Sequence, residues 1–264
     1  MNEACLKVYI SGCRSDTATE RRVLQEQVFP KLAKWCEHKN VQLLVTDMRY
    51  ENNTELKVDL CVNEIDKSSI VLGIYGSRLD EVRIIDSSVS KRHPWLSNLP
   101  TAGKDRGVST TQIEAHRATL NDETYRRPLV PKRSHDFYYF RDNDFLERDG
   151  VPLHLHDRFL PGTYTRIAGQ LHFVKDTKQI QLFQDLKSAI MKQAEVSSSH
   201  ITIEQGYQCK YKGDVSANDY LEGLNAFCTT VAKDLASTVA RLFPTVEKPI
   251  PSKVHESILS HQRY

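Results

Sequence analysis

The sequence predicts an α/β fold in which helices cover both faces of a central parallel sheet. One observation is that apolar strand segments and amphipathic helical segments alternate from the first residues onward, in the order β-α-β-α-β. Another is that Ser69–Tyr75 is almost continuously apolar and rich in β-branched residues. That composition is typical of a parallel strand that is buried on both faces.

The first part of the chain supplies three strands and the two helices between them. The predicted strands are Leu6–Ser11, Val41–Thr46 and Ser69–Tyr75. The predicted helices are Glu20–Cys36 and Leu56–Lys67, where apolar residues recur at helical spacing. Residues 76–107 contain two prolines and mixed charge, so we expect an irregular insertion there.

The second part continues the same pattern with longer irregular stretches. Ser109 or Thr110 is expected to cap a helix that runs to about Leu120, and residues 145–175 are expected to be rich in loops. The remaining expected elements are a strand at Asp136–Arg141, a helix at Thr177–Ala194, a strand within residues 200–212, and a helix capped by Ser216 that ends at Phe243 before Pro244.

Composition excludes several classes of protein. A formal net charge of +2 is too small to indicate a nucleic-acid-binding protein or a protein that binds anionic membranes. No apolar run is long enough to span a bilayer, and no signal peptide is visible. The six cysteines form no C-x-x-C pair, and His154 and His156 have no third ligand, so no metal site is expected. We therefore expect a protein of the reducing cytoplasm.

A series of short stretches connects the chain to a known family. They are Val8–Ser11 with Glu20–Arg21, Val28–Leu32, Asp47–Arg49, Glu64–Asp66 before Ile74–Gly76, and Ser109–Glu114 before Tyr138–Arg141. In this order they resemble the N-terminal TIR-like domain of large NACHT proteins that carry TPR or WD40 repeats, of the nephrocystin and telomerase-associated type. The chain departs from the family in the loops at Tyr50–Glu51 and Gly76–Asp80, which lack the family's usual tryptophans.

The resemblance implies a TIR-like, flavodoxin-like sheet with a C-terminal helical extension. We expect a core at residues 1–142, a continuation of the same domain at 143–243, and a linker at 244–264 that leads to a NACHT nucleoside-triphosphatase. The chain would then be an N-terminal fragment or a short isoform. It contains no G-x-x-x-x-G-K-[ST] loop, so ATP hydrolysis by a P-loop mechanism is not expected.

Two functions follow from the resemblance. The first is a signalling and protein-interaction module of a STAND-type protein, which associates with itself, with protein partners or with the downstream NACHT domain, and which needs no cofactor. The second is a TIR-type NAD hydrolase, with NAD as substrate and Glu114 as the catalytic carboxylate. A fixed negative charge near the ribose would stabilise a transition state that resembles an oxocarbenium ion. Alternatively, Glu114 favours the positive end of its helix or pairs with His116 or Arg117.

The residues that could help to bind a nucleotide lie in two loops. After the first strand, Gly12 permits close backbone approach, Arg14 offers a charged fork and Ser15 offers a hydroxyl. The alternative is that this loop only caps the following helix. After the second strand, Asp47 and Arg49 either contact a ribose or form an ion pair that shapes their loop.

Overall fold

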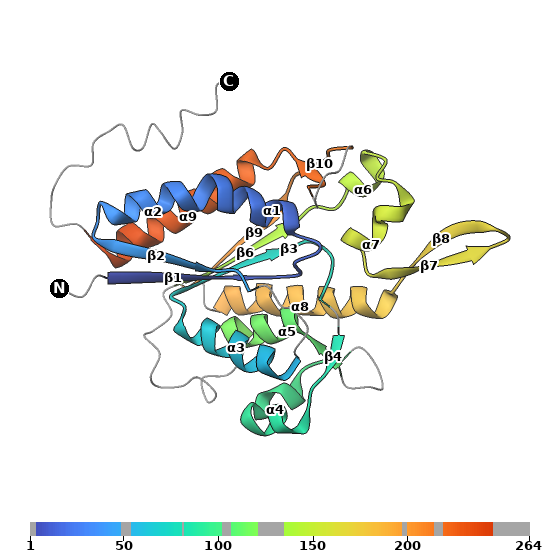
Figure 1. The fold of residues 1–264 in the computed structure, drawn as a ribbon, viewed down its shortest axis with the longest axis horizontal. Coiled ribbons are helices and arrows are strands. Elements are labelled where there is room, and N and C mark those ends of the chain that lie inside the picture. The colour runs from blue at the N-terminus through green and yellow to red at the C-terminus, as the bar shows by residue number, and fades with distance from the viewer. Residues whose placement is uncertain are drawn as a thin grey trace.

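A five-stranded parallel sheet lies at the centre of the structure, which is a computed structural model (Figure 1). The structure describes residues 4–48, 54–80, 82–101, 107–120, 135–196, 200–213 and 219–244. The strand order is β2-β1-β3-β6-β9, and every neighbouring pair is parallel. This is the flavodoxin-like order of a doubly wound sheet. The strands are β1 (Ala4–Ser11), β2 (Val41–Thr46), β3 (Ile70–Tyr75), β6 (His135–Arg141) and β9 (Ile201–Tyr207).

Helices cover both faces of this sheet, as Figure 1 shows. The upper layer in that view consists of α1 (Ala18–Val23), the π-helical turn η1 (Leu24–Val28), α2 (Phe29–Glu37) and α9 (Asn225–Leu242). The lower layer consists of α3 (Thr54–Lys67), α5 (Thr110–Ala115), its π-helical continuation η3 (His116–Leu120) and α8 (Thr177–Val196). The predicted α/β fold with helices on both faces of a parallel sheet is therefore confirmed.

The alternation of side chains along the strands divides the core into two layers. In β1, Val8 and Ile10 face the α2 and α9 layer, whereas Tyr9 faces α3 and α5. All six residues of β3 are buried, which agrees with the continuous apolar composition of that segment. Beneath β6, the rings of Tyr138 and Phe140 pack with Phe183, Leu186 and Ile190 of α8. Helix α8 is thus part of the covering layer of the sheet.

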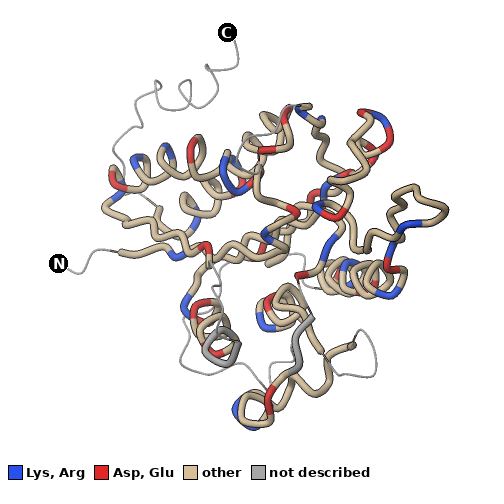
Figure 2. The backbone as a smooth tube through the Cα atoms, turned by 45° about the vertical axis from the view of Figure 1, so that its right-hand side comes forward, with Lys and Arg blue, Asp and Glu red and all other residues tan. Residues whose placement is uncertain are grey.

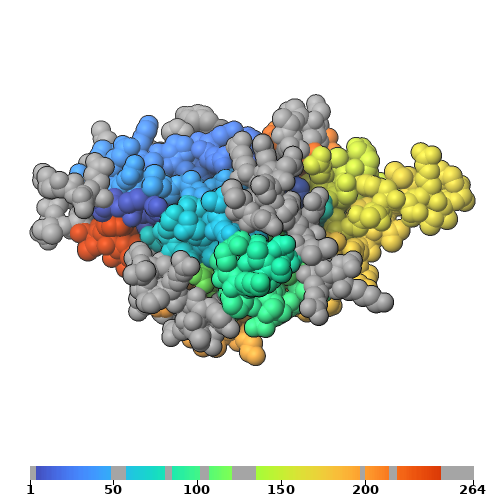
Figure 3. All heavy atoms as spheres, turned by 60° about the horizontal axis from the view of Figure 1, so that its bottom comes forward, coloured from blue at the N-terminus to red at the C-terminus, as the bar shows by residue number. Residues whose placement is uncertain are grey.

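Smaller elements surround this core. Below the sheet, a lobe contains β4 (Val82–Ile84), α4 (Ser87–Arg92), the 3-10 turn η2 (Pro94–Asn98) and β5 (Gly107–Ser109) (Figure 3). Near the carboxyl ends of the strands lie α6 (Phe145–Arg148), η5 (Leu153–Leu155), α7 (His156–Phe159), β10 (Lys210–Tyr211) and β11 (Leu221–Glu222). A hairpin of β7 (Gly162–Ile167) and β8 (Gln170–Lys175) projects from the body. None of the helices within the described ranges combines the length and apolar composition needed to cross a bilayer.

Most predicted elements are present, and four predictions need correction. Residues 76–107, predicted to form an irregular insertion, contain the short elements β4, α4 and η2. The helix predicted from Ser216 begins at Asn225, because Leu221 pairs with Tyr211 in a short antiparallel ladder, and Ser216 itself lies outside the described residues. The region 145–175, predicted to be rich in loops, contains the β7–β8 hairpin. The single helix predicted at Glu20–Cys36 contains the π-helical turn Leu24–Val28, just before Pro30, whose missing N–H interrupts regular helix bonding.

Candidate functional site

The candidate site lies at the carboxyl ends of β1 and β3. The chain winds away from β1 in opposite directions, toward β2 on one side and toward β3, β6 and β9 on the other. In doubly wound folds this switch point is where ligands bind. The loop after β1, the loop after β3 and the first turn of α5 meet there. Because Ser109 and Gln112 form a reciprocal capping box, the start of α5 is fixed and Glu114 is directed at β1.

Glu114 is held by hydrogen bonds from the first strand and its loop. The hydroxyl of Tyr9 donates to Oε1 at 2.6 Å. The hydroxyl of Ser11 and the backbone N–H of Gly12 donate to Oε2 at 2.8 and 3.1 Å. The thiol of Cys61 lies 3.9 Å from Oε1. Glu114 itself is only 3% exposed, so both carboxylate oxygens are engaged within the protein interior.

Burial changes the acidity of this carboxyl. The pKa of Glu114 is raised to about 7, first by desolvation and then by the nearby carboxylate of Asp80, while the bonds from Tyr9, Ser11 and Gly12 partly oppose the shift. Glu114 therefore changes its protonation state near neutral pH. A group of this kind is suited to proton transfer or charge stabilisation if a substrate reaches it.

The two alternative partners of Glu114 within its own helix, His116 and Arg117, lie in different surroundings. Arg117 forms a bidentate pair with Asp66 of α3, with both N···O distances at 2.6 Å. His116 is largely buried, which lowers its pKa to about 4. Glu114 is thus held by the carboxyl end of β1 and the loop that follows it.

Position 12 requires glycine, because the backbone of the loop after β1 lies directly against the backbone of β3. The φ of Gly12, +120°, is unfavourable for any other residue, and a Cβ at this position would lie 2.1 Å from the carbonyl oxygen of Ile74. Its N–H donates to Glu114, and its carbonyl accepts from the Arg21 guanidinium at 2.7 Å. The loop after β1 is therefore packed against β3, and both backbone groups of Gly12 already have partners.

The other predicted ligand residues lie around this loop. The side chain of Asp47 is only 8% exposed and pairs with Arg21, and it also accepts from Gln25 at 2.9 Å. The Arg14 guanidinium lies 3.9 Å from Asp47, and its side chain is 42% exposed. Ser15 is exposed and contacts the Cys13 thiol at 3.3 Å. Arg49 lies outside the described residues, so its predicted pairing with Asp47 stays a prediction.

A buried ionic cluster next to this loop was not predicted. Arg141 at the end of β6 pairs with Asp16, and it also pairs with Glu20 at 2.6 Å. All three side chains are fully buried. Asp16 accepts in turn from the backbone N–H groups of Ser77 and Arg78 at 2.7 and 2.9 Å. The cluster ties the loop after β1 to the loop after β3 and to β6.

A pattern in the sequence marks Tyr9 and Ser11 as residues that need a buried partner, although it does not say that this partner is Glu114. Tyr9 and Ser11 are two residues apart in β1, so they face the same side of the sheet. They share this face of β1 with Cys5 and Lys7, but unlike those two residues they are buried. Their hydroxyls therefore needed a buried partner, and Glu114 supplies it.

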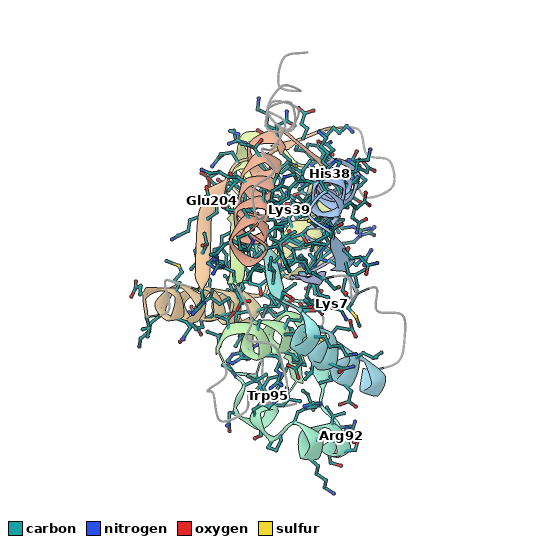
Figure 4. All side chains as sticks on the ribbon, turned by 90° about the vertical axis from the view of Figure 1, so that its left-hand side faces the viewer. Lys7, His38, Lys39, Arg92, Trp95 and Glu204 are labelled. Atoms are coloured by element: carbon teal, nitrogen blue, oxygen red, sulfur yellow. The ribbon has the colours of Figure 1, made fainter. Side chains whose placement is uncertain are left out.

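A surface cavity of about 630 Å³ lies elsewhere, between α3 and the lobe that contains α4. Its lining includes Asp59, Trp95 and Arg117 but not Glu114. Figure 4 places Arg92 and Trp95 on this lobe, at the opposite end of the molecule from His38 and Lys39. The charged groups at its rim are paired, because Asp59 binds both Arg92 at 2.8 Å and His93 at 2.7 Å. This cavity does not give access to the candidate carboxylate.

Comparison with known proteins gives distant similarities. No family model matches the chain. It is 25% identical over 264 residues to telomerase protein component 1 of Mus musculus and 24% identical to that of Rattus norvegicus, in each case over 96% of this chain. It is 27% identical over 155 residues, or 55% of this chain, to a TPR repeat-containing protein of Dictyostelium discoideum. The chain spans about 9% of the length of each of these relatives.

Proposed function

We propose that this chain is a TIR-like protein-interaction module of a NACHT-type signalling protein, and that it acts by association and not by catalysis. The observation that carries the proposal is the closed state of Glu114. Both of its oxygens accept hydrogen bonds from Tyr9, Ser11 and Gly12 inside a buried site. A carboxylate used in this way fixes the switch point of the sheet, because it joins β1 to α5.

The distant relatives support the same proposal. They are a telomerase protein component and a protein with TPR repeats, both much longer than this chain. Similarity over about 9% of such proteins is compatible with one module among several. All six cysteines are unpaired thiols, which supports a place in the reducing cytoplasm. The module would associate with itself or with other proteins when the full chain assembles.

Association can be tested directly with the purified chain. Light scattering over a range of concentrations measures self-association, and cross-linking in cell extract followed by mass spectrometry measures specific partners. We expect either a concentration-dependent rise in mass or a set of proteins that cross-link reproducibly to this chain but not to an unrelated α/β protein. A chain that stays monomeric and yields no specific cross-link would contradict the proposal.

The alternative function is NAD hydrolysis with Glu114 as the catalytic carboxylate. One observation favours it: Glu114 has a pKa near 7 and lies at the ligand-binding switch point. For turnover, the loop at Gly12 has to move so that a ribose can reach the carboxylate, and Arg14, Ser15 and Asp47 would then border the substrate. Nicotinamide release from NAD, measured with the chain alone and with the chain fused to an oligomerising tag, tests this function. Activity that disappears in Glu114→Ala would establish it over the interaction module.

A further inference from the structure

The β7–β8 hairpin stands apart from the body of the molecule. It projects from one end of the domain in Figures 1 and 3. No residue of either strand is buried. The two strands form a sheet of their own within the described part of the chain, so each has one edge without a neighbouring strand. Unpaired edges of this kind are ready to pair with another extended segment.

Exposed apolar side chains are concentrated on this hairpin. Large hydrophobic residues with high exposure number seven among the described residues, and three of them are Ile167 at 57%, Leu171 at 43% and Val174 at 50%. Leu153, at 38%, adds a fourth at the base of the hairpin. Apolar groups that gather on one exposed element mark a site of interaction.

The hairpin is held firmly at its base. Tyr164 and Phe173 face each other across the two strands with ring centroids 5.2 Å apart. The Tyr164 hydroxyl donates to the carbonyl of Leu153 at 2.9 Å, and the ring of Phe173 lies against His156. These contacts fix the orientation of the hairpin, and the part beyond them remains exposed.

The charge of the hairpin has a single sign. Residues 162–175 contain Arg166, His172 and Lys175 but no aspartate or glutamate. Within the described parts of the chain, no ion pair involves any of these three basic residues. Figure 2 shows basic segments on the projecting hairpin. An acidic partner would therefore find unpaired cationic side chains, whereas a second copy of the same hairpin would be repelled.

The two faces of the hairpin offer different chemistry. Ladder pairing places Arg166 and Lys175 on one face, together with Leu171, and places Ile167 and Val174 on the other. A strand added beside this ribbon would have alternate residues on the two faces. Beside β8, acidic residues of the added strand would lie next to Lys175 and across Leu171 from Arg166, while apolar residues on the other face would lie next to Val174 and across Gln170 from Ile167.

Strand β8 is the better edge for such an addition. Five of its six residues are exposed, compared with three of six in β7. Because Ala168 and Gly169 form a two-residue turn, Ile167 and Gln170 are the pair that exchanges hydrogen bonds. The backbone groups of Leu171 and Phe173 then point away from β7 and toward the open edge.

We propose that the β7–β8 hairpin binds an extended acidic segment of a partner protein, which adds as a strand along β8 and alternates acidic with apolar residues. This inference rests on the proposed interaction function and adds the surface and the chemistry of the partner to it. Backbone hydrogen bonds would supply the general attraction, and the basic face would select acidic sequences.

The probe is a short fluorescent peptide that alternates glutamate and valine, titrated with the whole chain and followed by anisotropy. We expect saturable binding that weakens as salt is added. A peptide that alternates lysine and valine should bind at least about tenfold more weakly. The glutamate–valine peptide with N-methyl groups along one edge should also bind about tenfold more weakly. It keeps its side chains, but its methylated edge cannot form backbone hydrogen bonds with β8.

Variants of the chain locate the site. Arg166→Glu combined with Lys175→Glu should reverse the preference between the acidic and basic peptides. The matched control is Lys31→Glu with Lys34→Glu, two exposed lysines on α2, which should leave the preference unchanged. Leu171→Pro removes a backbone donor from the open edge and should weaken binding about tenfold more than Leu171→Ala, which removes only the side chain. Circular dichroism verifies that each variant is folded.

Different failures of these experiments have different meanings. The hairpin inference is overturned if the acidic peptide does not bind, if N-methylation is tolerated, or if the charge reversal has no effect. If the charge-reversed chain still yields the partners that cross-link to the unchanged chain, the hairpin is not their site but the interaction function stands. If the unchanged chain neither associates with itself nor yields specific cross-links, the proposed function itself fails.

Discussion

The hydroxyl of Tyr9 lies 2.6 Å from the carboxylate of Glu114, although 105 residues separate them in the chain. One residue belongs to the central strand of the switch point and the other to the helix that follows the insertion below the sheet. Their contact closes the position where a doubly wound fold would otherwise admit a ligand. The carboxylate acts here as a buried connection between strand and helix.

The raised pKa of Glu114 predicts a pH-dependent effect on stability. Folding favours the protonated carboxyl, so its stabilising contribution is complete below about pH 4.5 and is lost as the pH rises through about 7. Glu114→Gln removes this loss. Relative to the variant, the unchanged chain should lose on the order of 2 to 3 kcal/mol of unfolding free energy between pH 5 and pH 8. Urea denaturation at both values measures the difference.

The exposed Glu147 provides a control for this experiment. Glu147→Gln removes a carboxylate from the surface, where solvent screens its interactions, so its effect should be small at both pH values. The difference in unfolding free energy between Glu114→Gln and the unchanged chain should depend on pH. If this difference is the same at pH 5 and pH 8, Glu114 is not the group that titrates.

Removal of the Tyr9 hydroxyl should have a larger effect at high pH. The hydroxyl donates to Glu114 and opposes the rise in the pKa of that group, so Tyr9→Phe should raise this pKa further. We expect a loss of about 1 to 3 kcal/mol in unfolding free energy at pH 8 and a smaller loss at pH 5. Tyr211→Phe is a suitable control, because the Tyr211 hydroxyl donates to the exposed carbonyl of Gly213. A pH-independent loss in Tyr9→Phe would indicate a packing effect alone.

Gly12 and Gly150 distinguish close packing from backbone strain. Both have positive φ, at +120° and +66°, but only at Gly12 would a Cβ meet another backbone, at 2.1 Å from Ile74. Gly150→Ala should therefore cost about 1 kcal/mol, the strain of a left-handed alanine. Gly12→Ala should lower the unfolding free energy several times as much, and it should weaken the hydrogen bond from the N–H of residue 12 to Glu114. Thermal denaturation of the two variants compares them, and similar costs would contradict the close packing at Gly12.

Local patterns were sufficient to predict most of the fold. The strand at Val41–Thr46 has the predicted bounds, and Ser109 caps the helix that carries Glu114. These features depend on residues close together in the chain, such as an apolar run or a serine before a helical pattern. The prediction that a helix starts at Ser216 was wrong because it depended on a contact between distant residues. Leu221 pairs with Tyr211 in an antiparallel ladder, so the helix begins only at Asn225.

The contacts of the candidate site depend on the order of the strands, which local patterns do not contain. Glu114 could be identified as a candidate, but its donors Tyr9 and Ser11 could not, because nothing near them in sequence indicates which helix will cover β1. The same holds for Arg141, whose partners Asp16 and Glu20 lie more than a hundred residues earlier. Buried polar contacts of this kind become visible only once the parallel register is known.

The buried cluster of Arg141 leads to a final prediction. Its guanidinium lies over the rings of Phe145 and Phe159, 5.4 Å from each centroid, and binds Asp16 and Glu20. Arg141→Met keeps much of the apolar volume but leaves two buried carboxylates without their counter-charge. We expect a loss of about 3 to 5 kcal/mol in unfolding free energy, measured by urea denaturation.

A second substitution separates loss of charge from loss of packing in this cluster. Glu20→Gln in the Arg141→Met background removes one of the uncompensated charges, so part of the lost stability should return. Arg166→Ala, which alters an exposed arginine, should change the unfolding free energy by no more than about 0.5 kcal/mol. If Glu20→Gln restores nothing, the aromatic packing around Arg141, and not its charge, would hold the loops after β1 and β3 together.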